Sequence, residues 1–394
     1  MGNKYDFDAV IDRRETFAVK HEMLPKGAPE DSLALWVADM DFAVAPEILS
    51  AMEKRLNHGI FGYTMYHSEP LKRSITDWFS RRYQWGMNPR DVFFCPGIVP
   101  AISYLLELMT EEGDGVIIQR PVYYPFTNKI EARGRKVVNS PLKYDGELYS
   151  MDFEDLEEKF KDPSVKGMIL CNPHNPVGRV WTKEELKSVA DFAKKYKKWI
   201  ISDEIHCDLT REGITYTPFV SVAEDILDQI VVCTAPSKTF NLAGLQLSNV
   251  VIFNKEWQKK WKEYVWDVLN LSSPNPFAVE ATIAAYNEGE EWLEELRGYL
   301  DGNFQYVKER LEKDLPKAKL IPSEGTYLAW MDFSAYSKDQ EALEKAMHRE
   351  KLALDEGYIF GEEGIGFERM NLAAPREIVQ EAMDRLIRGI KGLE

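Results

Sequence analysis

Short runs of apolar residues recur along the middle of the chain, and each ends in a polar or glycine- and proline-rich segment. Runs of four to six apolar residues without polar alternation are typical of strands that are buried on both faces of a sheet. Six segments have this form: VFFCPG (92–97), GVIIQRP (115–121), GMILCNPHNPVG (167–178), WIISDEIH (199–206), IVVCTAPSK (230–238) and NVVIFN (249–254). The pattern predicts a strand at the start of each segment.

Helical patterns lie between several of these runs. The segment IVPAISYLLELMTEEGDG follows Gly97 and predicts a helix that ends by Gly113. Thr182 and Glu185 have the spacing of a capping box at the start of TKEELKSVADFAKKYKK. Alternating strands and helices predict an α/β fold with a doubly wound, mostly parallel sheet, and such sheets bind ligands beyond the carboxyl ends of their strands.

The rest of the chain predicts a second, smaller unit. Residues 255–315 are helical in pattern, and residues 316–394 combine a strand-like segment with two helical ones. A chain of 394 residues also exceeds the usual size of one hydrophobic core. We therefore expect a large domain over 46–285 and a small α+β domain formed by 1–45 together with 286–394.

Composition and charge disfavour several classes of partner. The formal net charge is −16, which disfavours binding to nucleic acid or to an anionic membrane surface. No apolar run approaches the ~18–20 residues that span a bilayer, and the N-terminal residues are polar and lack an apolar signal core. We therefore expect a cytoplasmic protein that binds neither nucleic acid nor membrane.

The cysteines and histidines do not have metal-binding spacings. The four cysteines form no CxxC pair, and each lies in or beside an apolar run, which favours reduced core thiols. The six histidines show no HExxH or HxH spacing, and His206 and Asp208 beside Cys207 are a weak case for a ligand set. No metal site is predicted.

The polar segments that follow the strands carry candidate chemistry, although each also has a simpler structural explanation. Gly97 before a helix offers backbone N–H groups to an anion, or it is a plain turn. Asn175 could offer its amide to a ligand oxygen, or it forms an Asx turn. Asp203 follows a buried strand, so its carboxylate pairs with a cationic ligand group or caps a helix. Desolvation would lower the pKa of Lys238 and make its amine nucleophilic, unless the side chain extends to solvent.

Together these four positions match the needs of pyridoxal 5′-phosphate (PLP). An anion cradle suits the phosphate, a carboxylate suits the ring nitrogen, an amide suits the ring hydroxyl, and a lysine binds the aldehyde. The combination is more specific than any of its parts. A nicotinamide-dependent dehydrogenase is disfavoured because no GxGxxG follows a predicted strand.

The motif order resembles that of fold-type I PLP enzymes of the aspartate aminotransferase superfamily along essentially the whole chain. The segments WVADMDF (36–42), FGYT (61–64), NPHNPVG, SDEIH and PSKTFNLAGL resemble the MalY/PatB group of cystathionine β-lyases, also called C–S lyases. The resemblance implies a PLP-binding domain with a mixed seven-stranded sheet and an active site shared in a homodimer.

The resemblance also implies roles for residues around the cofactor ring. Lys238 matches the lysine that carries PLP, Asp203 the acid that keeps the ring nitrogen protonated, and Asn175 the amide that faces the ring hydroxyl. Tyr123 matches the aromatic residue that stacks on the ring, with Tyr124 as its possible rival. The backbone phosphate cradle matches Gly97, Ile98 and Val99.

Further positions match substrate-binding residues. Arg369 matches the arginine that binds the substrate α-carboxylate with its bidentate fork, and the backbone N–H of Ala38 lies near the same group. Tyr63 matches a tyrosine that reaches the phosphate of the neighbouring subunit, and we expect it to serve substrate binding and catalysis as well.

Three positions depart from the wider superfamily. His206 stands near the ring hydroxyl where many aminotransferases have a tyrosine. Ala235 and Gln246 replace a serine and an arginine that usually hold the phosphate. The remaining candidates for phosphate binding are the backbone amides, Thr234, Ser237 and Tyr63.

The function implied is β-elimination from a sulfur amino acid. Lys238 is expected to remove the α-proton, and Lys238 or Tyr63 to protonate the leaving thiolate. Cystathionine would give homocysteine, pyruvate and ammonia. Transamination of amino acids at the same site is the nearest alternative, and a PLP-binding regulatory protein with little turnover is a second one.

Overall fold

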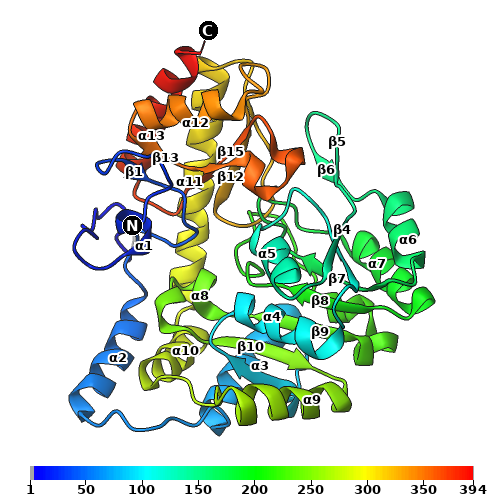
Figure 1. Cartoon of the computed structure of the whole chain (residues 1–394). Helices are drawn as coiled ribbons and strands as arrows, with labels where there is room; N and C mark the ends of the chain where they lie inside the picture. Colours follow the sequence, from blue (N-terminus) through cyan, green and yellow to red (C-terminus); the bar gives the residue numbers. More distant parts are fainter. Residues whose placement is uncertain (1–3, 394) are drawn as a thin grey trace.

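The structure, a computed structural model that describes residues 4–393, places the six predicted strands in one sheet (Figure 1). Within these residues the sheet has seven strands in the order β2-β10-β9-β8-β7-β3-β4. Their bounds are β2 (Val92–Cys95), β3 (Gly115–Ile118), β4 (Lys136–Asn139), β7 (Val165–Cys171), β8 (Trp199–Asp203), β9 (Ile230–Thr234) and β10 (Ser248–Ile252). The seventh strand, β4, is the one that the apolar pattern did not predict.

The sheet is mixed but mostly parallel, which confirms the predicted fold class. Only β10 among these strands runs antiparallel to its neighbours β2 and β9. The others pair in parallel, so the carboxyl ends of β7, β8 and β9 meet at one edge. Asp203, the last residue of β8, lies between Cys171 of β7 and Cys233 of β9 in the register.

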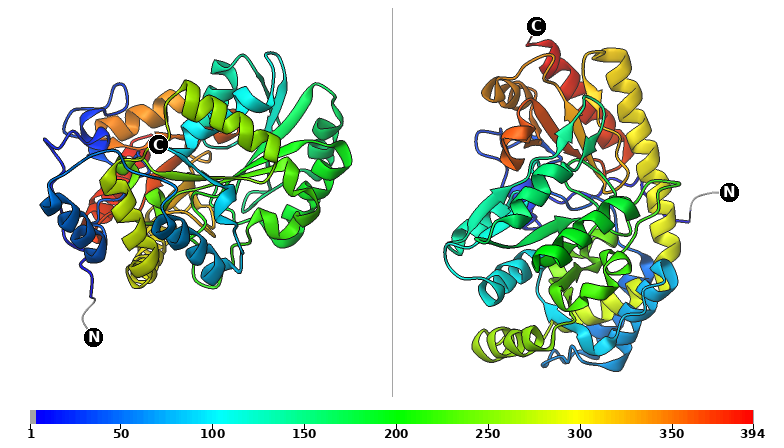
Figure 2. Two further views of the ribbon diagram at one scale, coloured as in Figure 1. Left: turned by 90° about the horizontal axis from the view of Figure 1, so that it is seen from below. Right: turned by 90° about the vertical axis from the view of Figure 1, so that its right-hand side faces the viewer.

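Both faces of the sheet are buried. Successive residues of each strand point to opposite sides, so each strand contributes side chains to two cores. In β2, for example, Val92 and Phe94 enter one core, whereas Phe93 and Cys95 enter another. Figure 2 (left) shows helices on both sides of the strands. The first core also contains residues of α3 (Glu69–Tyr83), α6 (Phe153–Lys161), α7 (Lys183–Tyr196) and α10 (Pro276–Glu288). The second contains residues of α4 (Ile98–Met109), α5 (Pro125–Ala132) and α9 (Lys255–Trp261).

Two helix starts that the sequence predicts are confirmed. Helix α4 begins at Ile98, directly after Gly97. Helix α7 begins with the predicted capping box: the Thr182 hydroxyl accepts from the Glu185 backbone at 3.2 Å, and the Glu185 carboxylate accepts from the Thr182 backbone at 2.8 Å. These bonds satisfy N–H groups that the first helical turn leaves free.

A smaller sheet carries a core of its own. Its four strands have the order β11-β12-β15-β14 and the bounds β11 (Lys319–Leu320), β12 (Leu328–Asp332), β14 (Asp355–Glu356) and β15 (Phe367–Asn371). The core on one face of this sheet includes residues of α11 (Glu290–Asp314), α12 (Gln340–Arg349) and α13 (Arg376–Lys391). The long helix α11, yellow in Figures 1 and 2, runs from the large sheet to the small one.

The N-terminal segment packs on the smaller sheet region, because β1 (Leu33–Ala34) pairs in parallel with β13 (Leu352–Ala353). The expected domain boundaries at residues 45, 46, 285 and 286 stay a prediction. The remaining helices and strands are α1 (Val19–Glu22), α2 (Pro46–His58), α8 (Pro236–Thr239), β5 (Lys143–Tyr144) and β6 (Tyr149–Ser150). The short helices are η1 (Pro89–Asp91), η2 (Phe219–Val222), η3 (Glu224–Gln229), η4 (Ala243–Leu245), the π-helical η5 (Lys262–Val268), η6 (Gly357–Phe360) and η7 (Glu362–Gly364).

Two further expectations concern cysteines and membranes. Cys95, Cys171, Cys207 and Cys233 are all buried and free of disulfides in the described chain, as the sequence predicts. Across residues 4–393, no helix combines the length and the apolar character needed to cross a bilayer.

Candidate active site

A cavity opens at the carboxyl edge of the large sheet, where the segments after β2, β7, β8 and β9 meet. Ten of the predicted site residues line it: Ala38, Gly97, Ile98, Val99, Tyr123, Asn175, Asp203, His206, Ser237 and Lys238. Parallel strands bring these sequence-distant residues together because their carboxyl ends share one edge. Arg369 and Tyr63 do not line the cavity.

Lys238 lies on the short helix α8, four residues after the end of β9. Its Nζ donates to the carbonyl oxygen of Ala38 at 2.5 Å. Burial lowers the pKa of the amine to about 8, with the charge of Asp39 acting in the opposite direction. A larger fraction of this amine is therefore neutral near pH 7 than for an exposed lysine, which favours nucleophilic and basic chemistry.

Asp203 is buried at the floor of the cavity and is 4% exposed. Its Oδ1 accepts from the backbone of Ile205 at 3.2 Å, and no ion pair within 4 Å is formed with any lysine or arginine in residues 4–393. Burial raises the pKa of the carboxyl to about 7, although the Ile205 bond and the charge of Lys238 lower it. A positively charged ring nitrogen in the cavity would supply the missing partner.

Asn175 connects the cavity to the smaller sheet. Its Oδ1 accepts from Nη1 of Arg369 at 3.0 Å, and its backbone carbonyl accepts from the backbone N–H of Tyr123 at 3.0 Å. Arg369 lies on β15, so this bond joins the two sheets. The predicted arginine does not line the cavity, but its hydrogen bond to Asn175 connects it to the lining.

The guanidinium of Arg369 has further partners, which the sequence did not predict. Nη2 donates to the carbonyl oxygen of Trp36 at 2.9 Å and pairs with the buried carboxylate of Asp355. Nε is buried and has no hydrogen-bond partner among the described residues. An incoming carboxylate would therefore meet an arginine that is already oriented by neighbours.

The segment WVADMDF is fixed against the segment that carries Lys238. Asn241 accepts from the backbone of Met40 at 3.1 Å and donates to the carbonyl oxygens of Met40 and Phe42 at 3.0 and 3.1 Å. From the other side, Arg13 pairs with Asp39 at 2.8 Å. These contacts explain why Ala38, in the same segment, reaches the amine of Lys238.

The helix α4 provides the predicted anion cradle. Its first N–H groups, at Ile98 and Val99, belong to the turn that intrahelical bonds leave free, and the positive end of the helix dipole faces the cavity. Gln246, one of the departures from the superfamily, also lines the cavity. Thr234 does not: it is fully buried, and its hydroxyl accepts from Asn249 Nδ2 at 3.2 Å.

His206 lies in the cavity as a neutral imidazole. Burial lowers its pKa well below the ordinary value, and the charges of Lys238 and Arg369 act in the same direction. Its Nδ1 is buried and unpartnered within the described chain. Tyr327, which the sequence analysis missed, lies 5.9 Å from the imidazole between ring centres and donates its hydroxyl to Ala38 at 2.8 Å.

Tyr63 is fully exposed, in the segment between α2 and α3. It reaches no residue of its own chain's cavity. This position is the one expected of a side chain that acts on a neighbouring subunit, but that role stays a prediction.

The donor set of the cavity fits PLP. A buried amine, a buried carboxylate without a cationic partner and free helical N–H groups lie around one space, with the ring of Tyr123 at its wall. These groups match the aldehyde, the ring nitrogen, the phosphate and the ring face of the cofactor, respectively.

Comparisons with known proteins agree with this geometry. The family model described as aminotransferase class I and II matches residues 30–386. Cystathionine beta-lyase PatB of Bacillus subtilis is 41% identical over 90% of this chain and 92% of its own. Protein MalY of Escherichia coli is 34% identical over 99% of this chain and 100% of its own.

A solved structure is equally similar. Cystalysin from Treponema denticola, which contains a pyridoxal 5′-phosphate cofactor, superposes with a TM-score of 0.94 at 37% identity and covers 99% of this chain and 100% of its own. The predicted resemblance to the MalY and PatB group is thereby confirmed. The chain belongs to the class I and II aminotransferase family.

Proposed function

We propose that this protein is a PLP-dependent carbon–sulfur β-lyase that acts on cystathionine and related cysteine conjugates. The observation that carries the proposal is the burial of the Lys238 amine in one cavity with Asp203 and Asn175. The names of the relatives, cystathionine beta-lyase for PatB above all, select the lyase reaction among those that the family supports.

Five positions would hold the cofactor. Lys238 would bind its aldehyde carbon, Asp203 would face the ring nitrogen, and Asn175 and His206 would lie near the ring hydroxyl. The N-terminus of α4 would bind the phosphate. When bound, PLP supplies an electron sink that stabilises negative charge at the α-carbon of an amino acid.

The protein's own groups would orient the substrate and move protons. Arg369 would bind the α-carboxylate, with Asn175 and Trp36 holding the guanidinium in place. The Lys238 amine, whose pKa is lowered to about 8 by burial, would accept the α-proton as general base. Protonation of the leaving sulfur by Lys238 or Tyr63 would then complete the cleavage.

The products follow from the atoms involved. Cleavage of the bond between the β-carbon and sulfur of cystathionine, with uptake of one water, gives homocysteine, pyruvate and ammonia. A cysteine conjugate gives the corresponding thiol with the same two products.

Transamination is the second candidate, because the matching family is described by its aminotransferases and both reactions begin with removal of the α-proton. The two differ in their products. A transaminase returns a keto acid that keeps the substrate's side chain, and it releases no thiol.

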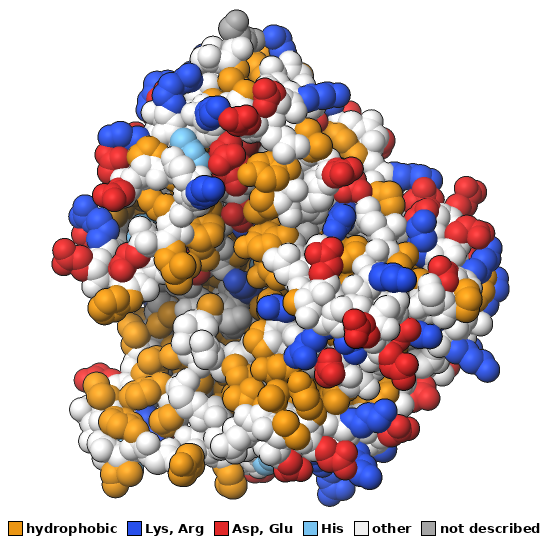
Figure 3. All heavy atoms as spheres, in the orientation of Figure 1, with side chains coloured by type: hydrophobic (Ala, Val, Ile, Leu, Met, Phe, Trp, Pro, Cys, Tyr) orange, Lys and Arg blue, Asp and Glu red, His pale blue; other side chains and the backbone are white. Residues whose placement is uncertain are grey.

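A homodimer belongs to the proposal. Hydrophobic side chains gather over α2 and the segment that follows it, at the lower left of Figure 3. The exposed apolar residues there are Leu49, Leu56, Ile60, Phe61 and Met65. A second subunit over this surface would cover it and would bring a partner chain close to Tyr63.

The cytoplasmic location expected from the sequence stays a prediction.

A product assay tests the proposal. The PLP-loaded protein is incubated with cystathionine and a panel of cysteine conjugates, and pyruvate and free thiol are measured in the same samples. The proposal predicts both products from at least one of these substrates. Formation of neither, or of a keto acid with the side chain retained, would reject it.

A further inference from the structure

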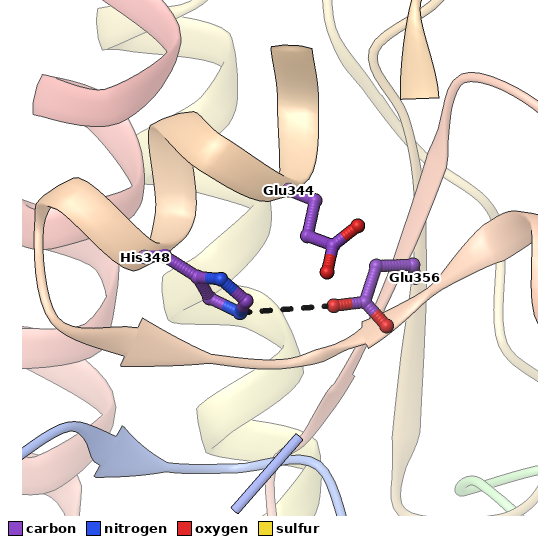
Figure 4. Close-up of side chains that lie close together, drawn as sticks. All are labelled: Glu344, His348 and Glu356. Atoms are coloured by element: carbon purple, nitrogen blue, oxygen red, sulfur yellow. Dashed lines mark ion pairs between the residues drawn. The ribbon is translucent and has the colours of Figure 1, made fainter. Parts of the chain in front are cut away.

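A second group of titratable side chains lies on the smaller sheet, away from the cavity of Lys238. It consists of Glu344 and His348 on α12 and Glu356 on β14 (Figure 4). One side-chain ligand atom from each lies within 4.8 Å of the others. The spacing of four residues puts Glu344 and His348 on one face of α12, and both side chains point toward Glu356 in Figure 4.

A fourth carboxylate adjoins this group. Glu368 on β15 is the direct cross-strand partner of Glu356 in the antiparallel register, so both side chains lie on the same face of the sheet. Glu368 is 1% exposed, and its Oε2 is buried without a hydrogen-bond partner in the described part of the chain. Two buried carboxylates are therefore adjacent beneath α12.

The carboxylates of this group have no lysine or arginine partner in the described chain. Among residues 4–393, no lysine or arginine forms an ion pair with Glu344, Glu356 or Glu368. Burial raises the pKa of Glu368 well above its ordinary value, and the charge of Glu356 adds to this effect. Adjacent buried carboxylates are unfavourable unless a proton or a cation compensates them.

His348 provides a ligand of a different kind. Its Nε2 lies 4.0 Å from Glu356 Oε1 and has no hydrogen-bond partner within residues 4–393. Burial lowers the pKa of the imidazole, which favours the neutral form that binds metals. A neutral imidazole nitrogen beside two or three carboxylates is a donor set that suits first-row divalent metals.

We propose that Glu344, His348 and Glu356, with Glu368 beside them, bind a divalent transition-metal cation of the Zn²⁺ or Mn²⁺ class. The cation would supply the positive charge that the carboxylates lack. It would also link α12 to β14 and β15.

Such a cation would lie on one face of the smaller sheet, and the candidate active site lies at the opposite face. It would affect that site through β15, which carries Arg369. Asp355 and Arg369 pair in the same register one position along, and neighbouring strand residues point to opposite faces. The face that would hold the metal is therefore opposite the face that presents Arg369 to Asn175. Metal binding would brace the strand that positions Arg369 and would not require contact with substrate.

Metal titration of the whole protein tests this site independently of the proposed function. The PLP-loaded enzyme is treated with a chelator, desalted and titrated with ZnCl₂ or with MnCl₂, with calorimetry and metal analysis as readouts. We expect one equivalent of at least one of the two metals per chain and a rise in Tm on binding. His348→Gln and Glu356→Gln should each weaken binding by at least about tenfold.

Glu341→Gln is the matched control, because this glutamate lies on the same helix but is exposed. It should leave the affinity unchanged. If Glu356→Gln does not fold, Glu344→Gln replaces it, since Glu344 is only partly buried.

Two results would overturn the proposal. One is the absence of stoichiometric binding of either metal by the wild type. The other is equal affinity in the wild type, His348→Gln and the glutamate variant. If the wild type binds neither metal and its stability falls as the pH rises toward 7, the carboxylates share a proton instead of a metal.

Discussion

Lys238 and Asp203 owe their altered ionisation to the same cause, because both are buried in one cavity of low polarity. The amine loses its proton more easily, and the carboxyl holds its proton more tightly. A cofactor with an aldehyde and a ring nitrogen would satisfy both groups at once. Substitutions of single charged residues, such as Lys238 and Arg369, distinguish cofactor binding from substrate binding.

Lys238→Ala removes the group that would hold the cofactor and accept the α-proton. We expect lyase activity to fall by at least about 10²–10⁴-fold, the usual contribution of a general base, and the visible absorbance of the lysine-bound cofactor to disappear. Lys183→Ala, at an exposed lysine, is the control and should change neither. Retained absorbance in Lys238→Ala would show that a different lysine holds the cofactor.

Arg369→Lys keeps the positive charge but removes the bidentate fork. Because Nη1 and Nη2 are oriented by Asn175 and Trp36, the shorter and single-headed ammonium cannot reproduce their geometry. Steady-state kinetics should show KM for cystathionine raised by about tenfold or more, with a smaller change in kcat. An unchanged KM would exclude Arg369 as the carboxylate-binding residue.

Lys72 is a buried lysine far from this chemistry, and it gives a pH-dependent prediction. Burial lowers its pKa to about 7, while the unfolded chain keeps the ordinary value near 10.5. Between these values the unfolded state binds more protons, so this group makes the free energy of unfolding increase as pH rises. Lys72→Met should flatten that increase between pH 7 and 9 in urea denaturation. An identical pH profile in both proteins would contradict this account.

At the scale of elements, the apolar pattern predicted strands where both faces are buried and failed where they are not. All six predicted strands belong to the large sheet, because each is a continuous buried run. The edge strand β4 was missed because its residues are only partly buried or exposed, beginning with Lys136. The direction of β10 could not be predicted, since a buried run has the same composition in either orientation.

The capping box of α7 gives a prediction at this scale. Thr182→Ala removes the side-chain acceptor for the Glu185 backbone, which is worth about 1 kcal/mol of stability at a helix N-terminus. Urea denaturation should show this loss, whereas Ser188→Ala, at a half-buried serine whose hydroxyl bonds only to a carbonyl inside the same helix, should not lower stability comparably. Equal stability of Thr182→Ala and the wild type would show that tertiary packing alone fixes the helix start.

At the scale of the whole molecule, the candidate site depends on contacts that no local pattern reveals. Lys238, Asp203, Asn175 and Gly97 were predicted because each lies at or just after the end of a strand of the same sheet. Tyr327 was missed because it is 289 residues away in sequence from Ala38, whose carbonyl oxygen accepts a hydrogen bond from its hydroxyl. Asp355 was missed because it reaches Arg369 only through the pairing of two strands of the smaller sheet. The group around Glu356 was missed for the same reason, since its members come from a helix and two strands.

The proposed dimer can be tested by mixing two inactive variants. If Tyr63 acts on the neighbouring subunit, a dimer of Lys238→Ala with Tyr63→Phe contains one intact site. Random reassembly of equal amounts should then restore about one quarter of wild-type activity, provided that Tyr63→Phe alone is strongly impaired. No recovery in verified mixed dimers would show that Tyr63 serves its own chain or no active site.

The central claim is that the buried lysine site cleaves a carbon–sulfur bond. The most direct measurement is the ratio of pyruvate to homocysteine formed from cystathionine by the PLP-loaded wild type, with Lys238→Ala run in parallel. The proposed β-elimination predicts equal amounts of the two products from the wild type and neither from the variant. A keto acid that retains the sulfur, formed without pyruvate or homocysteine, would contradict it.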